Sequence, residues 1–140
     1  MKQDLERSIS NIKKDLGIIT DKFPEFKENS LNSIQQRIAD MLKQVLTEDD
    51  KRRLMLETAI IIDKSDINEE LVRLNSHITA FEGSIEKNSD IGKSLNFILQ
   101  EMNREINTIG SKFNYSDVAV NVISIKEEIE KCRELIQNIE

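Results

Sequence analysis

The segment EMNREINTIGSK, residues 101–112, places several side chains capable of chemistry close together. It carries two carboxylates, a guanidinium, an amine, two hydroxyls and side-chain amides. At about 100° per residue of an α-helix, its polar residues share one arc of about 120°. The residues on this arc are Glu101, Arg104, Glu105, Thr108, Ser111 and Lys112, with Asn107 on its flank. A helix over this segment would therefore present one polar face.

This face could hold a metal ion and a phosphate. Glu101 and Glu105 are spaced i,i+4, where two like charges repel by roughly 0.2–0.5 kcal/mol unless they are neutralised. A divalent cation could bridge them, because oxygen ligands suit Mg²⁺ or Mn²⁺, and such an ion could activate water or stabilise charge on a phosphate. Arg104 and Lys112 could hold phosphate oxygens. The residue pattern alone nevertheless favours a solvated face with ion pairs, which is what charged helix faces usually are.

A second polar face is formed by Glu70, Arg73 and His77, which align at i, i+3 and i+7. His77 is the only histidine in the chain, so it could serve as a general base or as a metal ligand. A lone histidine is more often a structural residue. Cys132 is the only cysteine, which excludes an intramolecular disulfide, and one Cys with one His cannot supply the four ligands of a zinc site. Because Cys132 lies on an apolar stripe, we expect it in the core.

The elements that position these faces are predicted to be helices, because apolar residues recur in steps of four and three. We expect an all-α fold of five to six antiparallel helices, an elongated helical hairpin or coiled-coil-like bundle. A first stripe runs from Leu5 to Phe23, where Pro24 ends or kinks the helix. A second runs from Leu31 to Val45, and a third helix follows over residues 48–63 with a capping box at Thr47. This third helix contains LMLETAIII and is expected to be the most buried.

The later helices carry the polar faces. The fourth is expected to begin with Asp66 as its N-cap, the fifth to cover residues 91–113, and the last to follow a turn with Ser116 as its N-cap. The apolar stripe of the last helix is Val118, Val122, Ile125, Ile129, Cys132, Ile136 and Ile139. This stripe is too long for one short neighbour, which predicts self-association through it. We divide the chain into a lead-in segment, residues 1–63, and a C-terminal helical domain, residues 64–140.

Composition restricts the class of protein. The 140 residues carry a formal net charge of −6, which argues mildly against a non-specific nucleic-acid binder. The apolar runs are far shorter than the ~20 residues of a membrane span, and the polar N-terminus does not read as a signal peptide. We therefore expect a soluble, cytoplasmic protein without a membrane partner.

Three segments carry a family resemblance. LETAIIIDKSDINEELVRLNSHITAF, GKSLNFILQEMNREINTIGSK and IKEEIEKCRELIQNIE closely resemble the C-terminal domain of the YicC/YloC family of bacterial proteins. The likeness is strong over residues 56–140 and weaker before them. It implies a single-stranded RNA endonuclease that needs a divalent metal, Mn or Mg, acts in bacterial RNA turnover, and assembles as a homo-oligomer. DNA is not expected as a substrate. Full-length members carry a further N-terminal α/β domain, which this sequence does not contain.

The resemblance favours a functional role for the polar faces, and we infer the roles of the individual residues from their chemistry. Glu101 and Glu105 would be the metal ligands, and His77 or Glu70 the acid/base group, assisted by Arg104 and Lys112. The contacts to RNA phosphates would be Arg73, Arg104, Asn107, Thr108, Ser111 and Lys112. Two alternatives stay open. The helices could form a non-catalytic oligomerisation module, with RNA binding and cleavage in the absent N-terminal domain, or a coiled-coil adaptor for another protein.

Overall fold

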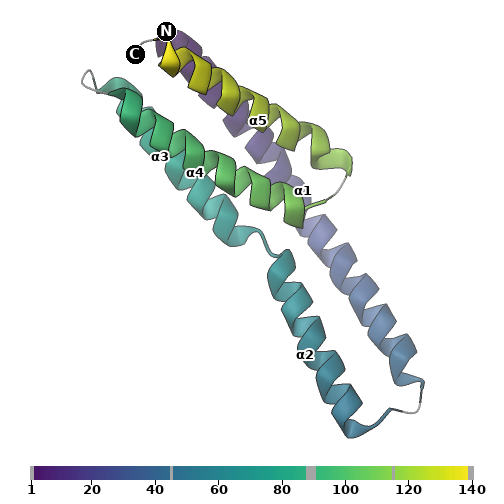
Figure 1. The fold of residues 1–140 in the computed structure, drawn as a ribbon. Helices are drawn as coiled ribbons and strands as arrows, with labels where there is room; N and C mark the ends of the chain where they lie inside the picture. Colours follow the sequence, from purple (N-terminus) through teal and green to yellow (C-terminus); the bar gives the residue numbers. More distant parts are fainter. Residues whose placement is uncertain (1, 45, 88–90, 115, 139–140) are drawn as a thin grey trace. The chain divides into compact units, whose positions relative to one another are not determined.

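The chain is a helical protein. The structure, a computed structural model, describes residues 2–44, 46–87, 91–114 and 116–138. These residues form five α-helices and no strand: α1 (Lys2–Leu42), α2 (Glu48–Ser65), α3 (Asn68–Glu86), α4 (Ile91–Lys112) and α5 (Ser116–Gln137), as Figure 1 shows. The all-α prediction is confirmed. No helix in the described part of the chain is long and apolar enough to cross a membrane.

The helices divide into two compact units. Residues 1–21 and 67–140 form the first unit, and residues 22–66 form the second. The first part of α1 therefore belongs with α3, α4 and α5, whereas the sequence-based division placed residues 1–21 with residues 22–63.

The first unit is a four-helix bundle with antiparallel neighbours. Lys13 of α1 donates to Glu82 of α3 at 2.8 Å, and Asn121 of α5 donates to Asp15 of α1 at 2.9 Å. The α4 helix packs between α3 and α5. The two polar faces of the sequence lie on adjacent helices of this unit, α3 and α4.

The core of the first unit consists of the predicted apolar stripes. Each stripe is buried on the side where its helix meets its neighbours, as an amphipathic helix requires. The buried residues are Leu5, Ile9, Ile12, Leu16, Ile19, Ile67, Leu71, Leu74, Ile78, Phe81, Ile85, Leu95, Ile98, Leu99, Met102, Ile106, Ile109, Phe113, Val118, Val122, Ile125, Ile129, Cys132 and Ile136. The side chain of Ile91 and residue Ile139 lie outside what the structure describes.

The described part of the α5 stripe, from Val118 to Ile136, is thus buried within a single chain. It has neighbours on both sides, because α1 and α4 each contribute an apolar face to the same bundle. It is not available for contact with a second copy, so the reason for expecting self-association through α5 is removed.

A glycine allows α4 and α5 to approach closely. A Cβ atom at Gly110 would lie 3.0 Å from Cγ1 of Val122, which is closer than two carbon atoms normally pack. The missing side chain therefore lets Val122 reach the backbone of α4.

The second unit differs most from the sequence-based expectation. Pro24 lies inside α1, so the two helices predicted before residue 45 are one. Pro24 did not separate them, and Val45 lies outside the described residues. The capping box at the start of α2 is confirmed, since Asp50 N donates to Thr47 Oγ1 at 3.1 Å and Thr47 N donates to Asp50 Oδ2 at 3.3 Å.

The prediction that the 48–63 helix is the most buried is wrong, because α2 has no buried residue among those described. Leu54 and Ile62 are half-buried, whereas four large apolar side chains are 45–71% exposed. These are Met55, Leu56, Ile60 and Ile61. Within its unit, α2 has only the second part of α1 beside it, so one apolar side is shielded and the rest is not.

Of the two other predicted N-caps, Asp66 is wrong and Ser116 is not tested. The N-cap of α3 is Ile67, without a side-chain capping bond, and Asp66 is instead the C-cap of α2. Ile67 is 0% exposed, so α3 begins at a buried apolar residue and not at a capping side chain. Ser116 is the first residue of α5, and residue 115 before it lies outside the described part.

Candidate functional site

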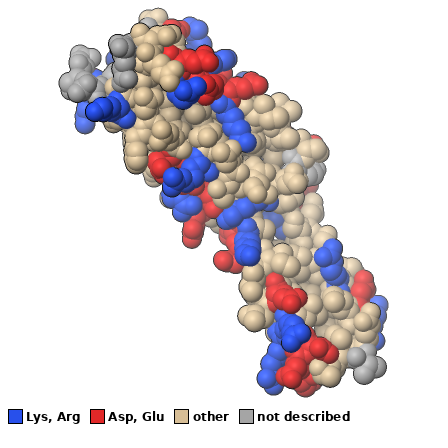
Figure 2. Space-filling view, viewed as in Figure 1, with Lys and Arg blue, Asp and Glu red and all other residues tan. Residues whose placement is uncertain are grey.

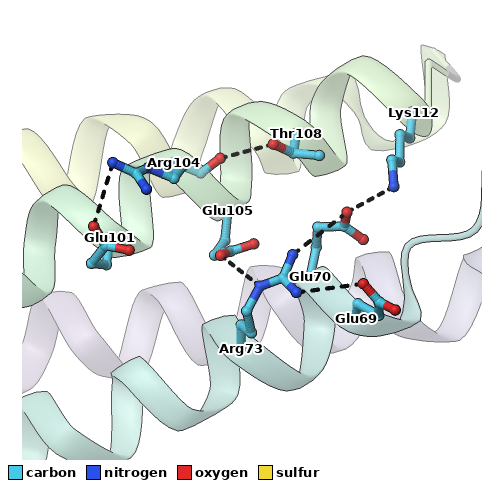
Figure 3. A network of polar contacts seen from close by, with 8 residues as sticks. All are labelled: Glu69, Glu70, Arg73, Glu101, Arg104, Glu105, Thr108 and Lys112. Carbon is cyan, nitrogen blue, oxygen red and sulfur yellow. Dashed lines mark hydrogen bonds and ion pairs between the residues drawn. The ribbon is translucent and has the colours of Figure 1, made fainter. Parts of the chain in front are cut away.

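The antiparallel packing of α3 and α4 brings the two predicted polar faces together, as Figure 3 shows. At one end, Lys112 Nζ donates to Glu70 Oε1 at 2.7 Å. Further along, Arg73 Nε donates to Glu105 Oε1 at 2.8 Å. The start of α3 therefore pairs with the end of α4, and the two faces form one network.

Both acceptors in this network are buried. Glu70 is 4% exposed and Glu105 is 5% exposed. A buried carboxylate is costly unless it is paired and hydrogen-bonded, and here Lys112 and Arg73 supply two positive charges for two negative ones. The sequence indicated that the charge of Glu105 needs a counter-charge. Arg73 of α3 supplies it.

Arg73 is the most connected member of the network. Besides its bond to Glu105, it lies 3.8 Å from Glu70 and 3.5 Å from Glu69. The hydrogen bond to Glu105 raises the pKa of Arg73. Its side chain is 48% exposed, so it joins the buried carboxylates to the surface. Glu69 is not among the site residues predicted from the sequence, although its i,i+4 spacing to Arg73 is a readable signal.

Glu70 carries an unpartnered oxygen. Its Oε2 atom is buried and, among the described residues, has no hydrogen-bond partner. Such an oxygen could accept a hydrogen bond from a ligand. This property keeps Glu70 as the acid/base candidate, a role that stays a prediction.

The remaining predicted residues of α4 point in different directions. Arg104 is 74% exposed and contacts Glu101 at 3.6 Å, while Asn107 and Ser111 are exposed. Thr108 donates its hydroxyl to the carbonyl oxygen of Arg104 at 3.1 Å. Its proton is therefore committed to the backbone, which makes Thr108 a poorer phosphate donor than Ser111.

His77 lies on α3, one turn beyond Arg73, and is half-buried. The pairs 70–112 and 73–105 set an antiparallel register that places His77 level with Glu101. Within the described part of the chain, no hydrogen bond or ion pair ties His77 to the network. The fold thus brings His77 to the same end of the face as Glu101 without fixing it there.

A divalent ion fits this face only as an open site. Among the described residues, no three Asp, Glu, His or Cys side chains converge as a group able to hold a metal ion. Mg²⁺ is, however, usually bound through one or two carboxylates, with water and substrate phosphates completing the shell. Glu101, whose one contact among the described residues is to Arg104 at 3.6 Å, suits that second arrangement. Glu105 is buried and its Oε1 is bonded to Arg73, so it could join such a site only through its other oxygen.

The charged surface is mixed. On the face of the first unit seen in Figure 2, Lys and Arg side chains are interspersed with Asp and Glu. No extended basic patch covers this face, which agrees with the net charge of −6. Binding of a polyanion here would depend on local contacts.

Comparison with known proteins places the chain in a family. Residues 19–140 match the family described as Endoribonuclease YicC-like, C-terminal. A protein of Clostridioides difficile named "Probable endoribonuclease YicC" is 50% identical over 91 residues, which cover 65% of this chain and 31% of that protein. A protein of Haemophilus influenzae with the same name is 30% identical over 125 residues, covering 89% of this chain and 44% of that protein. The chain thus spans less than half the length of these relatives. It belongs to the YicC-like endoribonuclease family and corresponds to the C-terminal part of the family's proteins.

Proposed function

We propose that this chain is the C-terminal helical part of a metal-dependent endonuclease that cuts single-stranded RNA in bacterial RNA turnover. The α3–α4 polar face is its contribution to the site. One observation carries this proposal: two buried carboxylates, Glu70 and Glu105, hold two cations across the helix pair. The printed names of the relatives, probable endoribonucleases, supply the class of reaction and of substrate.

The network would act by preorganisation. Arg73 and Lys112 are held by buried partners, so they need not reorganise when a phosphate arrives, and fixed charges stabilise developing charge best. Arg104 is exposed and free to turn, and its guanidinium can grip two phosphate oxygens at once. Asn107 and Ser111 add exposed hydrogen-bonding groups beside it.

The metal and proton-transfer roles follow from the same arrangement. Glu101 and Glu105 would hold the divalent ion, Mn or Mg, which would supply an activated water or charge stabilisation at the phosphate. Glu70, with its unpartnered buried oxygen, or His77, level with Glu101, would hold or accept the proton.

The test is cleavage of a short, unstructured RNA by this chain and by the longer C. difficile relative, with and without Mn²⁺. In this chain, Glu101→Gln is the clean variant, since Glu101 is half-buried and, within the described residues, is contacted by Arg104 alone, at 3.6 Å. Glu105→Gln would also disturb Arg73. Loss of a metal ligand should lower cleavage by orders of magnitude and weaken Mn²⁺ binding. Full activity of Glu101→Gln, or activity without any divalent ion, would contradict the proposal.

A second candidate function is assembly. The apolar side chains exposed on α2, above all Leu56 at 64% and Met55 at 71%, favour a homo-oligomerisation module, with cleavage located in parts of the longer relatives that this chain lacks. In that case only the longer relative would cut RNA. Replacing Leu56 and Ile60 together by Glu would then reduce the sedimenting mass, whereas Val120→Glu, at an exposed site on α5, would not.

A further inference from the structure

Phe97 of α4 is an aromatic side chain on the surface. It is 63% exposed, whereas Phe23, Phe81 and Phe113 are at most 4% exposed, and Phe26 is half-buried. A phenyl ring left in water forgoes the stabilisation that burial would bring. Phe97 therefore contributes little to the core of this chain.

The neighbours of Phe97 on its own helix face are polar. Lys93, four residues earlier, and Arg104, seven residues later, lie on the same exposed line of α4. They are displaced from Phe97 by about 6 Å and about 10 Å along the helix axis. Glu101, one turn after Phe97, is contacted by Arg104 at 3.6 Å. An aromatic ring thus stands between two cations.

A groove of about 220 Å³ runs beside this line, between α4 and α5. Three amide side chains of α4 line it, and α5 contributes cations on the other wall. The polar lining residues are Asn96, Gln100, Asn103, Lys126, Glu130 and Arg133. Arg133 is paired with Glu130, so Lys126 is the less restrained of the two cations. Amides offer both donors and acceptors, which is what the edges of unpaired bases require.

From this arrangement we propose that Phe97 stacks on a base of single-stranded RNA. Lys93 and Arg104 contact the phosphates to either side, and the amide-lined groove takes the edges of neighbouring bases. The inference rests on the proposed function and adds the path of the strand over α4.

RNA fits this surface better than a protein partner does. A protein interface needs a contiguous apolar core, but the line containing Phe97 is otherwise polar. Among the described residues of the first unit, the other large apolar side chains that are exposed lie on other helices, Val72 on α3 and Val120 and Ile123 on α5. Stacking also suits a face of mixed charge, because each stacked base contributes binding without a basic patch. It selects single strands, whose bases are free to stack on a side chain.

The test uses the full chain and a short unstructured RNA, followed by fluorescence anisotropy. The sequence has no tryptophan, so Phe97→Trp gives a single reporter at the proposed contact. Its emission should be quenched by RNA, with affinity close to that of the wild type. Phe97→Ala should weaken binding by about fivefold or more, as the loss of one stacked base does. Phe97→Leu should weaken it similarly, because it keeps an apolar side chain and removes the ring. Val120→Ala is the matched control, an exposed apolar residue on α5, and should bind as the wild type does.

The outcomes separate this inference from the proposed function. If the wild type binds RNA and Phe97→Ala binds equally well, or the emission of Phe97→Trp does not change, the stacking role is wrong and the proposed function stands. If Phe97→Ala alters only the sedimenting mass, Phe97 is a protein contact and the inference also fails. If the wild-type chain binds no RNA, both proposals fail for this chain. Circular dichroism of each variant checks that the helices are intact.

Discussion

Lys112 Nζ lies 2.7 Å from Glu70 Oε1, joining the last turn of α4 to the first turn of α3 across 42 positions of sequence. Glu70 is buried, and the Lys112 side chain is 27% exposed. This lysine is therefore first a structural counter-charge and only secondarily a surface group. Its position relative to any bound phosphate is set by Glu70, which links the stability of the helix pair to the geometry of the polar face.

We predict that Lys112→Met destabilises the chain by about 3–5 kcal/mol, because a buried carboxylate loses its partner. Arg73, at 3.8 Å from Glu70, compensates only in part. Urea denaturation followed by circular dichroism measures the change.

Two controls accompany this measurement. Lys13→Met breaks the exposed pair with Glu82, whose side chains are 52% and 43% exposed, and should cost at most about 1 kcal/mol. The double variant Glu70→Leu with Lys112→Met should recover most of the loss. Equal costs for Lys112→Met and Lys13→Met would show that the Glu70 pair behaves as a surface ion pair.

The buried thiol of Cys132 gives a pH dependence. Burial raises its pKa to about 11, above the value of about 8.5 expected in an unfolded chain. The folded protein then holds a proton that the unfolded chain has lost, so stability falls as the pH rises through the interval between these two values. The slope approaches −1.4 kcal/mol per pH unit. Cys132→Val should lack this component when free energies of unfolding are compared at pH 8 and pH 10.5. A wild type and variant with parallel pH profiles would show that the thiol pKa is ordinary.

The contact between α4 and α5 should be sensitive to one added methyl group. Gly110→Ala would place a Cβ atom 3.0 Å from Cγ1 of Val122, and Val122 is buried and stiff about χ1. We expect a net destabilisation of about 1–3 kcal/mol from overpacking, although Ala by itself favours helix over Gly by about 1 kcal/mol. In a Val122→Ala background the same change should become neutral or stabilising. A thermodynamic double-mutant cycle measures this coupling, and additive effects would contradict it.

Binding of single-stranded RNA should depend only modestly on salt. Four cations lie along the proposed path, namely Lys93, Arg104, Lys126 and Arg133, and we expect two to four of them to contact phosphates. With about 0.7 counter-ions released per phosphate of a single strand, the slope of log K against log salt should be about −1.4 to −2.8. Arg104→Gln should make the slope shallower by about 0.7. A slope much steeper than this range would point to an extended basic surface elsewhere.

Local periodicity determined most of the helices and the core. The steps of four and three depend only on helix geometry, so the stripes of α1, α3, α4 and α5 could be read without knowing their neighbours. The same arithmetic placed Glu101, Glu105 and Lys112 on one arc of α4. It failed for residues 48–63, where apolar residues around the helix suggested burial, because burial depends on how many neighbours a helix has. At Pro24 the sequence allowed either an end or a kink of the helix, and the end did not occur, since proline costs a backbone hydrogen bond but need not end a helix that packing supports.

Only part of the candidate site could be predicted from the sequence. Each polar face could be recognised on its own helix, together with a family resemblance that the comparison confirmed. The ion pairs between the two helices could not be predicted. Glu70 and Lys112 are 42 residues apart, Arg73 and Glu105 are 32 residues apart, and these partners meet only in one antiparallel register. The sequence by itself determined which side of each helix is polar. The tertiary structure alone decided which carboxylates are buried, which cations neutralise them and which side chains, Phe97 among them, are left facing water. Helix periodicity is a local property, whereas burial and charge pairing are set by the neighbouring helix.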